Sequence, residues 1–259
     1  MSNPINGADV KSHGSDWKVI FQDIVVGGSS GAVAALPIVP MIYFKNFYQN
    51  EAFDSSQKIS RDPRVWYRGS TNFAVSFIPS IAVQRTANEW FSRFGMDAIS
   101  SATGAGIASS LIVCPTECIM IQQQRTGEDF WTTVKKVHFQ FGIRGIFKGL
   151  LPTSVREGTF TAAYVVLGPK LKEKLEEKGC PQYPARILSG IFSGAAAALA
   201  SHPFDTCKTR MQQDLTSKKS MLQRIFKENA FAGLKWRSAI VSTAITIIPA
   251  VQDKIKERM

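Results

Sequence analysis

The residues of this sequence that could do chemistry gather directly after three prolines. After Pro203 come an acid at the second position, bases at the fifth and seventh and a glutamine at the ninth, namely Asp205, Lys208, Arg210 and Gln212. The same offsets from the other prolines give Glu117, Met120, Gln122 and Gln124 after Pro115, and Ile42, Lys45, Phe47 and Gln49 after Pro40. Acids and bases are the side chains that can form ion pairs, and here they recur at one spacing.

The recurring pattern marks three repeats of one unit. Each proline has a glycine nine residues before it, Gly31, Gly106 or Gly194, and successive prolines stand 75 and 88 residues apart. Recurrence at such an interval indicates an internal structural repeat. An aromatic residue, a base and a glycine also recur, as in Phe147-Lys148-Gly149. The chain therefore divides into a polar tail at 1–17 and repeats at 18–97, 98–184 and 185–259.

The first half of each repeat, which must position these charges, is typical of a membrane-spanning helix. Residues 25–44 contain no charge, and such a stretch is about long enough to cross the ~30 Å hydrocarbon core of a bilayer. Residues 98–115 and 187–204 are also uncharged and contain small residues at spacings that let helices approach closely in lipid. Buried helices of a soluble bundle are the alternative, although interior glycine and proline are costly there.

The second half of each repeat contains a shorter apolar segment, at 70–92, 150–168 and 237–255, with an uncharged core of 12 to 15 residues. Such segments suit helices that face both water and lipid, so six spans in three hairpins follow from the repeat. The apolar spacing within 131–141 and 221–226 predicts short surface helices. We expect the charged loops at 91–97 and 171–183 at the opposite end of the bundle.

Composition argues against several classes of function. The chain has 259 residues, a formal charge of +11 and a mean hydropathy of -0.04. Its bases form no block with interleaved aromatic residues, so nucleic acid is not expected as a partner. Three scattered histidines and four cysteines without ligand spacing predict no metal site, no cofactor and no enzyme. Residues 1–18 are polar and lack the apolar core of a cleavable signal peptide.

The three motifs in register resemble the mitochondrial carrier family, over about residues 18–259. The third motif matches the family pattern fully, the second lacks its base at Met120, and the first lacks its acid at Ile42 and its second base at Phe47. The resemblance implies an all-α bundle of six transmembrane helices with threefold pseudosymmetry around a substrate cavity. It also implies a monomer in the mitochondrial inner membrane that moves a small-molecule substrate by alternating access, with the lipid bilayer and anionic lipids such as cardiolipin as partners.

The family closes one end of its cavity by pairing the acid of one repeat with the base of the next. The helices are expected to bend toward a common axis at three prolines: Pro40, Pro115 and Pro203. The family rule then implies two ion pairs, Glu117 with Lys208 and Asp205 with Lys45. The third pair would join Ile42 and Met120, which are both apolar. Losing both partners of an ion pair can be nearly neutral, whereas losing one leaves an unpaired charge, so we expect a gate of two ion pairs and one apolar contact.

A second gate is implied at the other end of the cavity. The family uses an aromatic residue, an acid and, three positions later, a base near the ends of its second helices. The partial matches in this chain are Glu89, Lys172, Asp253 and Lys256. This gate is therefore expected to be weak and to open easily.

Family members bind substrate mainly on their second helices, seven residues beyond the repeat glycine. Counting from Gly149 leads to Arg156, beside Glu157, and intramembrane ionisable residues predict a functional site. An arginine can hold a carboxylate or a phosphate with two hydrogen bonds. Together with the corresponding and nearby positions of the other second helices, the expected substrate-binding set is Arg156, Glu157, Ser76, Gln84, Arg85, Tyr164 and Thr243.

Two classes of substrate fit this set. The Arg156–Glu157 pair resembles amino-acid carriers of the family, whereas the stretch from Arg68 to Gln84 and Tyr164 resemble its adenine-nucleotide exchangers. The arginine and methionine run of those exchangers is absent, but the positive charge suits phosphates. The sequence therefore narrowly favours a nucleotide such as ATP or ADP, with an amino acid or other carboxylate as the alternative. A non-transporting membrane scaffold of the same fold is the rival from another class, because both gates are incomplete.

Overall fold

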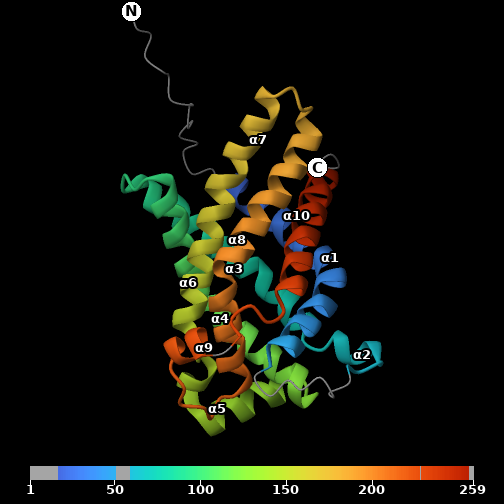
Figure 1. Cartoon of the computed structure of the whole chain (residues 1–259), viewed down its shortest axis with the longest axis vertical. Coiled ribbons are helices and arrows are strands. Elements are labelled where there is room, and N and C mark those ends of the chain that lie inside the picture. Colours follow the sequence, from blue (N-terminus) through green and yellow to red (C-terminus); the bar gives the residue numbers. More distant parts are fainter. Residues whose placement is uncertain (1–16, 51–58, 228, 257–259) are drawn as a thin grey trace, which may run out of the picture.

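The computed structural model describes residues 17–50, 59–227 and 229–256, and every regular element within these ranges is a helix (Figure 1). The long helices are α1 (Trp17–Gln49), α3 (Ser70–Arg93), α4 (Ala98–Thr126), α8 (Gln182–Gln213) and α10 (Leu234–Lys256). A further long segment runs through α6 (Leu150–Ala162), the π-helical turn η1 (Ala163–Leu167) and α7 (Gly168–Glu177). The remaining helices are α2 (Pro63–Trp66), α5 (Phe130–Ile146) and α9 (Met221–Lys227). The expected all-α class is confirmed.

The long helices form a closed ring in the order of the chain. α1 packs on α3, α3 on α4, α4 on α6, α6 on α8, α8 on α10, and α10 returns to α1. Each hairpin, α1 with α3, α4 with α6 and α8 with α10, corresponds to one sequence repeat. α8 also contacts α4 and α1, so the first helices of the three repeats approach one another inside the ring.

The two ends of the bundle carry different connections. Figure 1 shows α5 and α9 at the lower end, with α2 beside them, and the turn between α7 and α8 at the upper end. The sequence predicted this separation of the surface helices from the connections between repeats. The end that bears α5 and α9 is called the α5 end below, and the opposite end is called the α7 end.

A glycine with positive φ precedes the second helix of each hairpin. Gly69, Gly149 and Gly233 have φ values of 82°, 85° and 77° and stand directly before α3, α6 and α10. A side chain strains this left-handed conformation, which glycine adopts readily. The recurring aromatic, base and glycine pattern is thus, in part, the turn that directs the chain into the second helix.

One expected loop is largely helical. The segment 171–183 was expected to connect two repeats, but α7 continues to Glu177 and α8 begins at Gln182. Lysine, leucine and glutamate favour helix, and Lys172 lies 3.5 Å from Glu176 one turn later. The positive φ of Gly179 ends the segment. The repeat boundary placed at residue 184 falls just inside α8 and, like the boundary at residue 97, stays a prediction.

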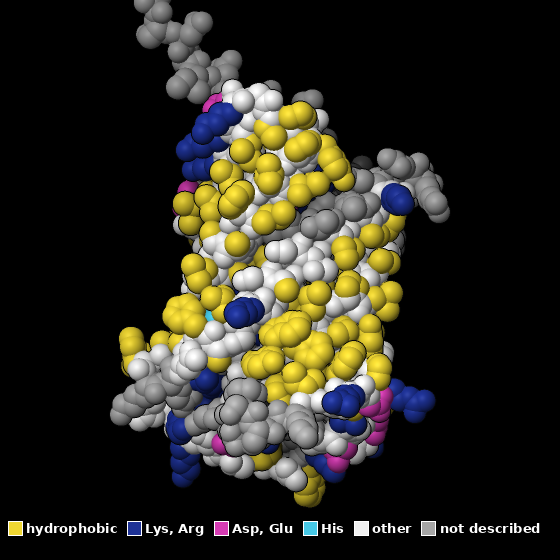
Figure 2. Space-filling model, turned by 45° about the vertical axis from the view of Figure 1, so that its right-hand side comes forward, with side chains coloured by type: hydrophobic (Ala, Val, Ile, Leu, Met, Phe, Trp, Pro, Cys, Tyr) yellow, Lys and Arg dark blue, Asp and Glu magenta, His cyan; other side chains and the backbone are white. Residues whose placement is uncertain are grey.

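The outside of the bundle is apolar around its middle. Figure 2 shows hydrophobic side chains across the middle of one face and lysine and arginine side chains mostly toward its ends. Outward side chains from five helices are 56% to 67% exposed: Leu36, Val75, Leu111, Leu151 and Phe192. By length and composition, α4 and α8 are the helices able to span a bilayer within the described ranges. An apolar belt between charged ends is typical of a surface that faces lipid.

Candidate functional site

The charged residues that follow the repeat prolines meet where the first helices approach one another. Lys45 Nζ lies 2.9 Å from Asp205 Oδ2, and Lys208 Nζ lies 2.7 Å from Glu117 Oε2. The structure therefore brings together both ion pairs that the family rule implies. The prolines themselves, Pro40, Pro115 and Pro203, lie inside α1, α4 and α8, which continue to Gln49, Thr126 and Gln213. A bend at each of these prolines stays a prediction.

The third position of the expected gate is apolar and packed. Ile42 and Met120, which are 8% and 3% exposed, belong to one buried cluster with Ala34 and Ile38. Hydrophobic side chains from α3 and α10, including Phe73, pack against this cluster. The third gate position, where the acid and the base are both missing, is thus filled by apolar side chains that need no counter-ion.

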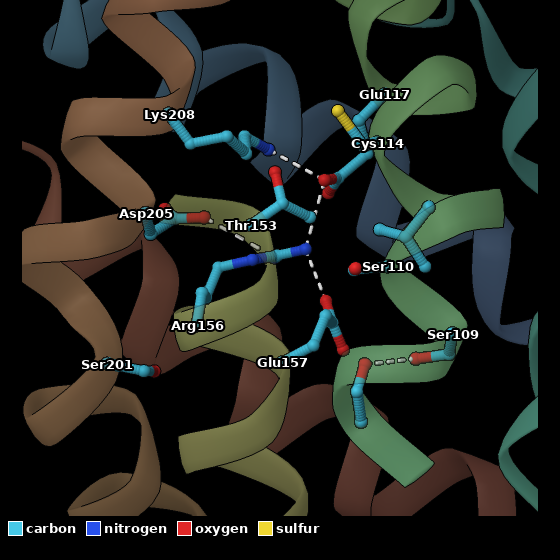
Figure 3. Close-up of polar contacts among 12 residues, drawn as sticks. Ser109, Ser110, Cys114, Glu117, Thr153, Arg156, Glu157, Ser201, Asp205 and Lys208 are labelled. Atoms are coloured by element: carbon cyan, nitrogen blue, oxygen red, sulfur yellow. Dashed lines mark hydrogen bonds and ion pairs between the residues drawn. The ribbon is translucent and has the colours of Figure 1, made fainter. Parts of the chain in front are cut away.

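Arg156 reaches the same charged group from α6. Its Nη2 lies 2.9 Å from Glu117 Oε2 and also pairs with Glu157. Its Nη1 lies 3.4 Å from Asp205 Oδ1. Figure 3 shows the Arg156 side chain between Glu117 on α4, Asp205 on α8 and Glu157 beside it on α6. The residue that the sequence assigned to substrate binding therefore also joins the two ion pairs.

Two further residues of this group were missing from the expected set. Arg237 of α10 places Nη1 2.9 Å from Asp205 Oδ1 and donates from Nη2 to Ser201 Oγ at 2.8 Å. Gln49 of α1 donates to Asp205 Oδ2 at 3.0 Å. The signal for Gln49 was its place nine residues after Pro40. Arg237 follows Gly233 by four residues and lies six residues before Thr243, the position expected in the third repeat.

The central charged cluster, as we call this group, is buried and carries one surplus positive charge. Its described members are Lys45, Arg156, Lys208 and Arg237 on the basic side and Glu117, Glu157 and Asp205 on the acidic side, and none of their side chains is more than 19% exposed. Removing an ion from water costs several kcal/mol, which close pairing offsets. Any movement that separates the helices must therefore supply new partners for these charges.

Three of the other residues expected to bind substrate make hydrogen bonds within the protein. Ser76 donates to the carbonyl of Phe73 in its own helix at 2.9 Å. Gln84 donates to Ser109 and Thr161 at 3.2 and 3.3 Å and so links α3 to α4 and α6. Thr243 faces the sulfur of Met41 on α1, 3.8 Å away. Arg85 is exposed on α3, and the side chain of Tyr164, in η1, lies outside the described residues.

Two residues of the expected second gate have described side chains, and each of them pairs within its own helix. Glu89 pairs with Arg93 at 2.7 Å, and Lys172 pairs with Glu176 at 3.5 Å, each within its own helix. The side chains of Asp253 and Lys256 lie outside the described residues. The part of this gate that the structure describes thus contains local pairs, in contrast to the pairs between repeats at the α5 end.

A sequence model of the family described as mitochondrial carrier protein matches residues 94–179 and 181–251. The chain belongs to the mitochondrial carrier family. The matched residues begin at the end of the first repeat, which is also the repeat whose motif lacks its acid and its second base. Membership gives six transmembrane helices in three hairpins and a place in the mitochondrial inner membrane. Members of this family are transporters of small molecules and not enzymes.

Proteins similar to this chain include carriers whose names give different substrates, or no substrate. The chain is 26% identical to mitochondrial substrate carrier family protein X of Dictyostelium discoideum, over 74% of this chain and 73% of that protein. It is 31% identical to a glutamate/glycine mitochondrial carrier of Schizosaccharomyces pombe, over 64% of this chain and 63% of that protein. It is 24% identical to mitochondrial citrate transporter A of Aspergillus niger, over 88% of this chain and 86% of that protein.

Proposed function

We propose that this carrier moves a small anionic metabolite, an amino acid or another carboxylate, across the inner membrane by alternating access. The observation that supports this proposal best is the setting of Arg156, a buried base held by carboxylates from α4, α6 and α8. A carboxylate of the substrate can replace these acids on the guanidinium group. Glu157, on the same helix, can receive an ammonium group.

A nucleotide, which the sequence narrowly favoured, has less support. The described central charged cluster has a surplus of one positive charge, whereas a nucleoside diphosphate or triphosphate brings several negative charges. Two of the three relatives named above carry glutamate and glycine, or citrate, according to their names. We therefore place the carboxylate class first.

The same contacts support a gate at the α5 end. Two ion pairs, Lys45 with Asp205 and Glu117 with Lys208, and the apolar cluster of Ile42 and Met120 hold α1, α4 and α8 together there. At the α7 end the described partners Glu89 and Lys172 pair within their own helices. We infer that this conformation is closed at the α5 end and gives access from the α7 end.

Uptake into liposomes tests the proposed function. The purified protein would be offered labelled L-glutamate, glycine, citrate or ADP, with empty and preloaded vesicles compared in order to separate uniport from exchange. We expect uptake of a carboxylate or amino acid but not of ADP, and loss of that uptake in Arg156→Gln. The matched control is Lys136→Gln, which removes an exposed base on α5. Preferential uptake of ADP would contradict the substrate class, and no uptake of any metabolite would favour the non-transporting scaffold.

A further inference from the structure

The carboxylate of Asp205 is held by side chains from three other helices. Lys45 and Gln49 of α1 contact Oδ2 at 2.9 and 3.0 Å. Arg237 of α10 and Arg156 of α6 contact Oδ1 at 2.9 and 3.4 Å. Asp205 is fully buried. The second helices of two repeats therefore supply a pair of arginines that already share one carboxylate, and in this conformation the carboxylate is the chain's own.

The bases and acids around this position belong to helices that must separate during transport. Arg156 and Arg237 stand on α6 and α10, whereas Glu117 and Asp205 stand on the gate segments of α4 and α8. Opening the α5 end moves those gate segments apart and withdraws both acids from the arginines. Glu157, on the same helix as Arg156, is then the acid of the described cluster that stays in place.

Both arginines have hydrogen-bonding capacity that the described residues do not use. The Nε atoms of Arg156 and Arg237 are buried, and neither has an acceptor among the described residues. Buried donors normally have partners, so these two N–H groups keep the capacity to donate to carboxylate oxygens that a substrate brings.

We infer that Arg237 is a second carboxylate-binding residue of the site and that the substrate is an amino acid with an acidic side chain. This inference rests on the proposed carrier function. Two guanidinium groups and one carboxylate leave a net charge of +1. A molecule with two carboxylates and one ammonium group neutralises this charge: one carboxylate binds Arg156, the other binds Arg237, and the ammonium group binds Glu157.

Simpler molecules fit these charges less well. An amino acid with a neutral side chain leaves Arg237 buried without a counter-ion once Asp205 has withdrawn. A dicarboxylate without an ammonium group places its charge beside Glu157 with nothing to offset the repulsion. Because unpaired buried charges are strongly unfavourable, the site distinguishes the three classes by charge as well as by shape.

Rates of uptake into liposomes for L-glutamate, L-aspartate, L-alanine and succinate test this assignment. For the wild-type chain, kcat/KM for an acidic amino acid should exceed that for L-alanine and succinate by at least about tenfold. Arg237→Gln should lower the ratio of acidic to neutral amino acid uptake by at least about tenfold, and Glu157→Gln should shift the preference toward succinate. The surface variant Lys136→Gln should leave both ratios unchanged.

A second variant, Arg237→Lys, keeps the test informative if Arg237→Gln fails to fold. Lysine keeps a positive charge beside Asp205 but lacks the planar guanidinium group that binds a carboxylate with two hydrogen bonds. The variant should therefore raise KM for L-glutamate more than for L-alanine. If both Arg237 variants lower all uptake by the same factor, the residue is only structural and the inference is overturned. Equal wild-type uptake of L-alanine or succinate overturns the substrate class, as does uptake of citrate or ADP with none of the four probes. A wild-type chain that transports none of these compounds contradicts the proposed function itself.

Discussion

Two acids of the central charged cluster each pair with more than one base. Asp205 contacts Lys45, Arg156 and Arg237, and Glu117 contacts both Lys208 and Arg156. An isolated surface ion pair contributes little to stability, whereas removing one member of a buried network leaves its partners without a counter-charge. The cluster is therefore most sensitive at its acids.

Replacing Asp205 with asparagine is expected to destabilise the protein strongly. The change leaves three buried bases with one fewer negative charge, and breaking a buried pair typically costs about 3–5 kcal/mol. The matched control is Glu89→Gln, which breaks an exposed pair within one helix and should cost about 1 kcal/mol or less. Thermal unfolding in detergent measures both. Equal shifts in the two variants would show that the cluster does not stabilise the bundle.

The apolar position of the gate predicts a rescue. Ile42→Glu places an acid in the buried cluster beside Met120 at a cost of about 2.5 kcal/mol or more. Adding Met120→Lys supplies the missing base, so the double variant should regain most of the stability and transport lost by the single one. A double variant as impaired as Ile42→Glu alone would refute the pairing between these positions.

Recurring offsets identified the gate residues, but they did not identify every member of the central charged cluster. The repeated spacing identified Lys45, Glu117, Asp205 and Lys208 as equivalent positions, and the resemblance to the carrier family implied how they pair. The offset from the repeat glycine leads to Arg156 in the second repeat, but in the third repeat it leads past Arg237 to Thr243. A count of residues gives the level on a helix and does not specify which neighbour a side chain faces. Ser76, Gln84 and Thr243 make hydrogen bonds within the protein, and their place at the substrate stays a prediction.

Among the helices, α4 approaches α6 closely near the site. A Cβ atom added to Gly106 would lie 2.5 Å from the carbonyl oxygen of Glu157 and 2.9 Å from the Cα atom of Gly158. Neither backbone atom can move without shifting α6, which also carries Arg156. The glycine that precedes Pro115 by nine residues thus positions the second helix of its repeat.

Gly106→Ala should lower stability even though alanine favours helix. The gain in helix propensity is about 1 kcal/mol, whereas overpacking typically costs about 1–3 kcal/mol. Leu111→Ala, an exposed change on the same helix, is the control and should shift the melting temperature less. A Gly106→Ala protein that is as stable and active as the wild type would show that α4 and α6 are further apart than described.

The helices differed in how far the sequence could define them. The uncharged stretches predicted α1, α4 and α8 because hydrocarbon excludes charges. The second helices contain shorter apolar segments, so their prediction depended on the repeat. α7 extends to Glu177 where a loop was expected, because the charged residues of this segment favour helix outside the membrane. The π-helical turn at Ala163–Leu167 precedes Pro169, and no recurring pattern in the sequence indicated it.

At the scale of the whole molecule, ligand binding should stabilise the bundle. A substrate that binds the folded protein adds about 2.7 kcal/mol when its concentration is a hundred times Kd. We expect L-glutamate to raise the melting temperature of the detergent-solubilised protein and ADP to leave it unchanged. Arg156→Gln should remove the shift. A shift caused by ADP alone would contradict the carboxylate assignment.

The central claim is that α1, α4 and α8 separate at the α5 end in every transport cycle. A cross-link between cysteines introduced at Ile42 and Met120, after replacement of the native Cys114, Cys118, Cys180 and Cys207, tests it most directly. The cysteine-free protein and the uncross-linked double variant must first show uptake. We predict that a short reducible cross-linker lowers uptake to background and that reduction restores it. Uptake by the cross-linked protein at the rate of the reduced protein would contradict the account.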